Sequence, residues 1–345
     1  MKQIAIHFQS PSQTFDSTEP VPLTERILGR LSESRGLKIA LWAAIPILRA
    51  MIFVLVFQGS ALNTLDWLML AFVISEALVY AYAIVHAIWG TAKITQEARA
   101  IEPTLAQLTV AGPDRTHVVF QGMGNAIGPI IMAMVVTLIL TADVAHMGNW
   151  WITTAVLVFT AAIHLPLAVW IWTYLMLMLG LNRLGARHLA LEAYSGDKSL
   201  GLRPVGKLAF TGFWIFTAIL VPILLISLSS VLSWVVGLVF FVAGVVLFFL
   251  SLWRVHAQME RAKQRQITNA HELYELAYEP LMTNYNLQEL KDRSSLLGAA
   301  QALEQRAEAI QTWPFSDAVI ARIAVIALGV LSAIVTRLVQ KPLGL

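Results

Sequence analysis

The sequence predicts an all-α protein: a polytopic bundle of transmembrane helices with a cytoplasmic helical hairpin. Charged residues make up only 13% of the chain, about half the share in soluble domains, which is roughly 25%. Hydrophobic residues make up 57%, and the mean hydropathy is +0.68. A spanning helix needs about 20 apolar residues. Six apolar segments predict spans and a seventh adds a further one, at residues 39–57, 66–89, 126–142, 151–181, 208–228, 232–253 and 318–336.

The distribution of Lys and Arg predicts how these helices are oriented. Of the 24 Lys and Arg residues, 20 lie in the N-terminal tail, in alternate connections and in the segment after the sixth span. The three short turns on the other side, around Gly59-Ser60, Gly148-Asn149 and Ser229-Ser230, contain none. Cytoplasmic loops are enriched in Lys and Arg. We therefore expect a multi-pass protein of the cell inner (cytoplasmic) membrane with a cytoplasmic N-terminus.

Four regions follow from this pattern. Residues 1–38 form a cytoplasmic tail that contains a short amphipathic helix, which suits either an anionic membrane surface or an ordinary docking site. Residues 39–253 form the six-span bundle, arranged as three hairpins. Residues 254–312 form a cytoplasmic arm of two helices, separated near Pro280 because proline interrupts a helix. Residues 313–345 form a turn and a C-terminal transmembrane helix.

The C-terminal helix has two interpretations. If it spans the membrane, Arg337 and Lys341 lie outside, against the charge rule. The alternative is a re-entrant or peripheral helix whose tail stays inside. Arg322 shares one helical face with small residues, which suits either an anion-permeable lining or close helix packing.

Arg49 and Glu76 are charged residues near the middle of the first and second spans. A charge at the centre of a bilayer costs about 3 kcal/mol or more. Folding the hairpin about residue 61 or 62 places Glu76 within about 3 Å of the level of Arg49. We therefore expect a pair inside the bundle, acting either as an ion path or as a contact that orients two helices.

His86 and His164 also fall within predicted spans. His164 precedes Pro166 by two residues, where a carbonyl freed by the proline is a candidate acceptor for the imidazole N–H. Two histidines on different helices, with no acidic or Cys pattern nearby, favour packing or hydrogen bonding over metal binding.

A stretch rich in glycine opens the third span. It contains Gly122, Gly124, Asn125, Gly128 and Pro129. This composition predicts an irregular backbone, which at membrane depth lines a cavity or is covered by protein. The stretch is a candidate constriction on the cytoplasmic side. The alternative is a plain helix start with proline in its first turn.

Trp313, Pro314 and Phe315 stand between the arm and the C-terminal helix. Proline breaks a helix, and aromatic rings favour the membrane interface. These residues are candidate interfacial anchors.

The sequence also argues against several function classes. The chain contains no Cys, so we expect no thiol catalysis or Cys-based metal site. Phosphate-loop, HExxH and GxSxG motifs are absent. We therefore expect no enzyme activity, catalytic residue, metal or cofactor.

Two functions remain. The first is a channel or transporter-like protein for ions or small solutes, whose intramembrane polar residues line the path. The second is a membrane-embedded sensor or scaffold whose arm, residues 254–311, binds a cytoplasmic protein. Expected partners are the lipid bilayer, further copies of the chain and that protein, and not nucleic acid.

Overall fold

The computed structural model describes residues 22–24, 26–27, 34–61, 67–108, 120–140, 150–191, 198–226, 231–278 and 287–340. Within these ranges the elements are helical and no β-strand occurs. The elements are α2 (Arg35–Ala61), α3 (Trp67–Leu108), the 3-10 helix η2 (Gln121–Gly124), α5 (Ile127–Leu140), α6 (Trp150–Gly185), α7 (Arg203–Ile226), α8 (Val231–Tyr278), α9 (Leu287–Glu308) and α10 (Asp317–Gln340).

Each of the seven predicted apolar segments forms an α-helix over the residues that the structure describes. Five helices in the described residues are long and apolar enough to cross a membrane, namely those that contain Gly36–Val54, Met69–Leu105, Thr153–Gly185, Arg203–Ile226 and Gly237–Tyr278. The apolar stretches of α5 and α10 are shorter, at Ile127–Leu138 and Ala318–Val330. The protein therefore has the all-helical, strongly apolar architecture of a membrane-embedded protein.

One predicted turn differs from expectation. The predicted turn at Gly59-Ser60 is helical, because α2 continues to Ala61; the turns near residues 148 and 229 lie outside the described residues. Helix α6 ends at Gly185, soon after its apolar part. By contrast, α3 and α8 continue without interruption far past their apolar parts.

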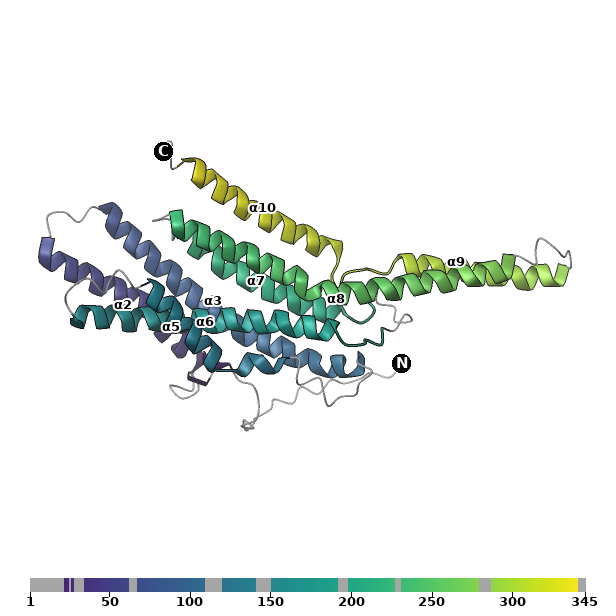
Figure 1. The fold of residues 1–345 in the computed structure, drawn as a ribbon, viewed down its shortest axis with the longest axis horizontal. Coiled ribbons are helices and arrows are strands. Elements are labelled where there is room, and N and C mark those ends of the chain that lie inside the picture. The colour runs from purple at the N-terminus through teal and green to yellow at the C-terminus, as the bar shows by residue number, and fades with distance from the viewer. Residues whose placement is uncertain are drawn as a thin grey trace.

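The main core lies between α3, α6, α7 and α8 (Figure 1). Its largest fully buried side chains include Trp170, Tyr174, Phe213 and Phe248. Phe216 stacks on both Tyr174 and Trp170, with ring centroids 4.6 and 5.6 Å apart. A smaller hydrophobic cluster joins α2 to α3 and α6. Aromatic rings thus fill the space between these four helices.

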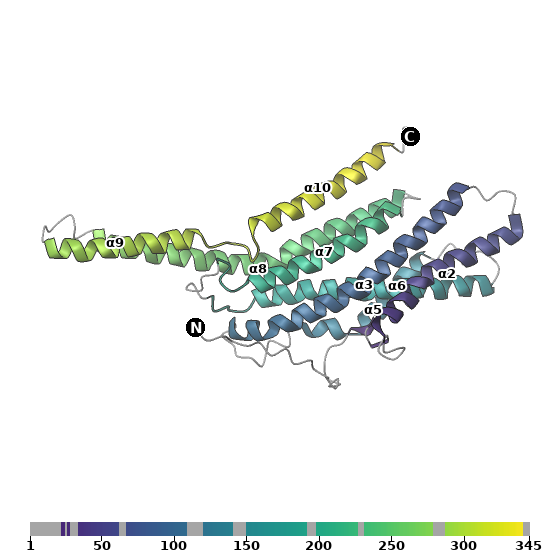
Figure 2. The ribbon, with the colours of Figure 1, turned by 180° about the vertical axis from the view of Figure 1, so that it is seen from behind.

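A long arm projects from the bundle. Helix α8 leaves the bundle, and α9 lies alongside its C-terminal half (Figures 1 and 2). The ammonium group of Lys263 donates to the carbonyl oxygens of Glu308 and Ile310 at 2.9 and 3.2 Å. Nearer the tip, His271 lies 3.1 Å from a carboxylate oxygen of Glu304. These contacts hold the C-terminal end of α9 against α8.

Candidate functional site

Arg49 and Glu76 line one cavity between α2 and α3. The cavity has a volume of about 90 Å³, and its other lining residues are Pro46, Ala50, Phe53, Val73, Ala77 and Tyr80. Both charged side chains are partly buried, and no ion pair joins them within 4.0 Å. A volume of this size corresponds to about three water molecules. The two charges therefore share a cavity, without the direct contact that the hairpin arithmetic suggested.

Arg49 also has polar neighbours on two other helices. Tyr80 of α3 lines the same cavity, and the His164 imidazole of α6 lies nearby. The Nδ1 atom of His164 lies 3.3 Å from the hydroxyl oxygen of Thr137 on α5, and both of those side chains are buried. The Thr137 hydroxyl, rather than a carbonyl freed by Pro166, is the partner that the structure gives His164.

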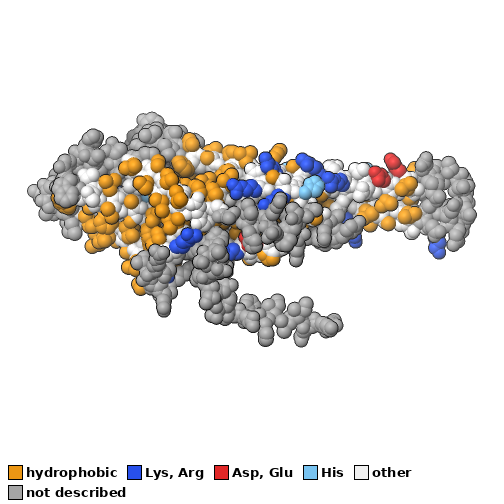
Figure 3. Space-filling view, turned by 60° about the horizontal axis from the view of Figure 1, so that its bottom comes forward, with side chains coloured by type: hydrophobic (Ala, Val, Ile, Leu, Met, Phe, Trp, Pro, Cys, Tyr) orange, Lys and Arg blue, Asp and Glu red, His pale blue; other side chains and the backbone are white. Residues whose placement is uncertain are grey.

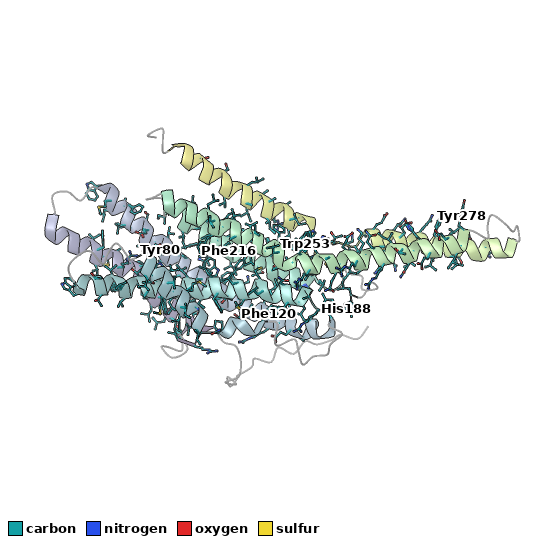
Figure 4. The ribbon with its side chains drawn as sticks, viewed as in Figure 1. Tyr80, Phe120, His188, Phe216, Trp253 and Tyr278 are labelled. Carbon is teal, nitrogen blue, oxygen red and sulfur yellow. The ribbon has the colours of Figure 1, made fainter. Side chains whose placement is uncertain are left out.

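We call Arg49, Glu76, Tyr80, Thr137 and His164 the polar cluster. It contains side chains from α2, α3, α5 and α6 inside an otherwise apolar bundle. Figure 4 shows Tyr80 in the part of the bundle that lies away from the arm. Sequence reasoning identified three of the five residues, and missed Tyr80 and Thr137 because neither residue type is unusual in a membrane helix.

His86 lies apart from the polar cluster. It is ten residues beyond Glu76 on α3, which is about 15 Å along the helix axis. Its ring lies 3.9 Å from the ring of Tyr82, and its Nδ1 donates to the Tyr82 carbonyl at 2.9 Å. This local contact accounts for its position without a ligand. Lys93 lies over the ring of Trp89 on the same helix, 4.7 Å from the centroid.

The glycine-rich stretch has the irregular backbone that its composition predicts. Residues Gln121–Gly124 form a 3-10 turn, and the Asn125 side chain accepts the backbone N–H of Ile127 at 2.9 Å, at the start of α5. The Trp172 indole of α6 donates to the Gly122 carbonyl at 3.1 Å. The Gly124 carbonyl accepts a hydrogen bond from Arg26 at 3.2 Å.

The glycines of this stretch allow α6 to approach closely. A Cβ at Gly128 would overlap the ring of Trp172, and a Cβ at Gly122 would lie 2.6 Å from the sulfur of Met176. Pro129 is buried. The space beside these backbones is therefore occupied by side chains of α6.

The turn at residues 313–315 packs against α8. The ring of Trp313 stacks on His256 with centroids 4.3 Å apart, and Phe315 stacks on Phe248 at 5.9 Å. Pro314 and Phe315 are buried. The turn thus fixes the beginning of α10 to the base of the arm.

Arg322 is far from the polar cluster in sequence and lies in a different environment. It is exposed on the first turns of α10, and it lines a second, larger cavity with Lys198, Arg203 and Lys207. A third cavity lies at the base of the arm, near His188 and Trp253 (Figure 4), and contains Arg187, Arg254, Arg261 and Arg265. Sequence reasoning counted these cations but did not group them into cavities.

In the described part of the chain, no group of three or more His, Asp or Glu side chains is arranged to hold a metal ion. Comparisons of the chain with protein-family models, with curated proteins and with solved structures found no match.

Proposed function

We propose that the protein is a multi-pass protein of the inner (cytoplasmic) membrane, with six or seven spans. In this proposal the N-terminus and the arm, residues 254–312, lie in the cytoplasm. The bias of Lys and Arg toward one set of connections supports this orientation. The gathering of Lys and Arg where the apolar surface gives way to the arm supports it too (Figure 3).

Within the membrane, we propose a channel or transporter-like function for ions or small solutes. The polar cluster is the observation that carries this proposal. An isolated charge at bilayer depth is unfavourable, and charged groups there mark ion or proton pathways. Side chains from four helices contribute to this cluster. A contact that only orients two helices would need side chains from those two helices alone.

The path would run on the side of the bundle formed by α2, α3, α5 and α6. The centre of the chain, between α3, α6, α7 and α8, is filled by aromatic rings. The small cavity at Arg49 and Glu76 gives water a place beside both charges. Further copies of the chain would complete such a path on the open side of α2, since only 6% of its apolar window is buried within the chain.

Ion flux in proteoliposomes tests this proposal. Purified protein is reconstituted, and the fluxes of K⁺, Na⁺, H⁺ and Cl⁻ are compared with those of empty vesicles. We expect at least one flux above background, and a reduction of about tenfold or more in Glu76→Gln and Arg49→Gln. Glu272→Gln, which neutralises an exposed carboxylate in the arm, is the matched control and should match wild type. Wild-type fluxes equal to those of empty vesicles would refute the proposal.

The arm favours a second candidate function, a sensor or scaffold that binds a cytoplasmic protein. The part of α8 beyond residue 254 is about 35 Å long. Near its end, Leu276 is 70% exposed and Leu273, Tyr274 and Tyr278 are also exposed. Grouped apolar side chains on a solvent-exposed helix are typical of a protein-binding surface.

Substitutions on this surface separate the two functions. Leu276→Ser with Tyr278→Ser should abolish capture of a specific partner and leave ion flux unchanged. Glu275→Gln, at the exposed position next to Leu276, is the control. The scaffold function loses its support if the same proteins are captured by wild type, by the double variant and by a chain without residues 254–311.

A further inference from the structure

The second cavity has the size and lining of a ligand site. Its volume is about 910 Å³, and it lies between the first turns of α7, the turn before α10 and the first turns of α10. Ligand pockets in proteins commonly have volumes of about 300–1,000 Å³. Nothing in the transport or scaffold functions requires this cavity.

Four cations line the cavity. Lys198 precedes α7, Arg203 and Lys207 lie on its first turns, and Arg322 faces the same cavity from α10. No carboxylate among the described side chains forms an ion pair with any of them. Like charges brought together repel one another, so an anion in the cavity would stabilise the arrangement.

The donors suit a phosphate group. Arginine presents a planar set of N–H donors that matches two phosphate oxygens, and lysine adds a compact charge. Ser199, which is buried, lines the cavity as well. Together, two guanidinium groups and two ammonium groups can surround one or two phosphates from both helices.

Apolar side chains continue from the cations. Phe210, Phe315 and Val319 line the same cavity. Farther along α10, Val325 and Leu328 are 69% and 66% exposed. In both views of the ribbon, α10 and α7 run in the same general direction, away from the arm (Figures 1 and 2). The cations therefore lie at the end of the apolar surface, at the level where a lipid headgroup meets its acyl chains.

We propose that this cavity binds a phosphate group, supplied by the headgroup of an anionic phospholipid whose acyl chains lie along α7 and α10. Basic pockets between transmembrane helices are a recurrent form of headgroup recognition. The bound lipid would strengthen the attachment of α10 to the bundle. Among the described α10 side chains, only Ile323 is buried in the core, and Val319, Ile320 and Val330 pack against it.

Lipid binding to the full-length, delipidated protein in a mild detergent tests the proposal. Native mass spectrometry would count bound dioleoyl phosphatidic acid, phosphatidylglycerol and phosphatidylcholine, with inorganic phosphate as a competitor. Each cation near an anionic headgroup contributes roughly fivefold in affinity. Arg203→Gln with Lys207→Gln should therefore weaken binding of the two anionic lipids about 30-fold. Arg322→Gln, from the other helix, should weaken it about fivefold.

The matched control is Lys291→Gln with Arg306→Gln, which removes two charges from exposed positions of α9. It should bind lipid as wild type does, and thermal unfolding should show that all variants remain folded. If millimolar phosphate does not displace the anionic lipid, the assignment of the cavity to a lipid headgroup is supported. Displacement by phosphate would assign the site to a soluble phosphate compound and overturn the lipid assignment. Equal binding of phosphatidylcholine, or wild-type binding by the Arg203/Lys207 variant, would overturn the site itself.

Discussion

Replacing Gly206 by Ala tests how the arm and α10 are attached to the bundle. Gly206 lies in the first turn of α7, and a Cβ there would overlap the carbonyl oxygen of Pro314 and lie 3.3 Å from the backbone nitrogen of Phe315. A backbone atom cannot rotate away as a side-chain end can, so the whole turn at residues 313–315 must shift.

The magnitude follows from two opposing effects. Overpacking a well-packed site costs about 1–3 kcal/mol, and the rigid neighbour places this site at the upper end. Alanine offsets up to about 1 kcal/mol, because it is the better helix former. The net effect expected is a loss of about 2 kcal/mol from the attachment of the turn, which makes the detached state about 30-fold more populated.

Thiol labelling measures this population directly. The chain has no Cys of its own, so Ile310→Cys introduces a single thiol at a position that is 7% exposed. The labelling rate of this thiol should rise about 30-fold when Gly206→Ala is added. Gly298→Ala is the matched control, because nothing lies within 4 Å of its added methyl group; it should leave the rate unchanged. Equal rates in the Gly206 and Gly298 variants would show that the close contact does not hold the turn.

Three other predictions concern orientation and packing. In right-side-out vesicles, an impermeant maleimide should label Trp67→Cys and should not label Glu272→Cys. The native Trp67 side chain is 82% exposed at the start of α3. The opposite labelling pattern would contradict a cytoplasmic arm. Gly128→Ala should lower thermal stability in detergent. Adding Trp172→Phe should partly restore it, because this substitution removes the overlapping ring atoms, and the coupling energy between the two substitutions should be about 1 kcal/mol. Additive losses of stability would contradict the contact. Tyr174→Phe should cost about 1 kcal/mol, since its buried hydroxyl donates to a carbonyl of α8 at 3.0 Å; an unchanged melting temperature would show that this bond contributes nothing.

The sequence predicted the helices because their apolar length is a local property. Each run of about 20 apolar residues satisfies its backbone hydrogen bonds internally, so a helix follows wherever the run occurs. Even the level match of Arg49 and Glu76 was accessible, because a short connection fixes how two antiparallel helices align. Helix ends were less accessible: Gly59 and Ser60 suggested a turn, yet α2 continues past them, since glycine is tolerated in a helix at a modest cost.

The remaining parts of the candidate sites depend on tertiary packing. Thr137 and His164 lie 27 positions apart in sequence, and they meet only because α5 packs on α6. The cations of the second cavity run from residue 198 to residue 322. No local pattern predicts that α7 and α10 bring them to one cavity.

The glycine-rich stretch shows what composition alone leaves open, and it changes where a solute path should be sought. A glycine can mean open space for a ligand or close approach of a neighbour. Beside Gly128 the neighbour is the ring of Trp172, and beside Gly122 it is Met176, so both backbones are covered by α6. A constriction there would require α6 to move. The cavity at Arg49 and Glu76 already has space for water next to two charges, and substitutions at those two residues are therefore the more direct test of transport.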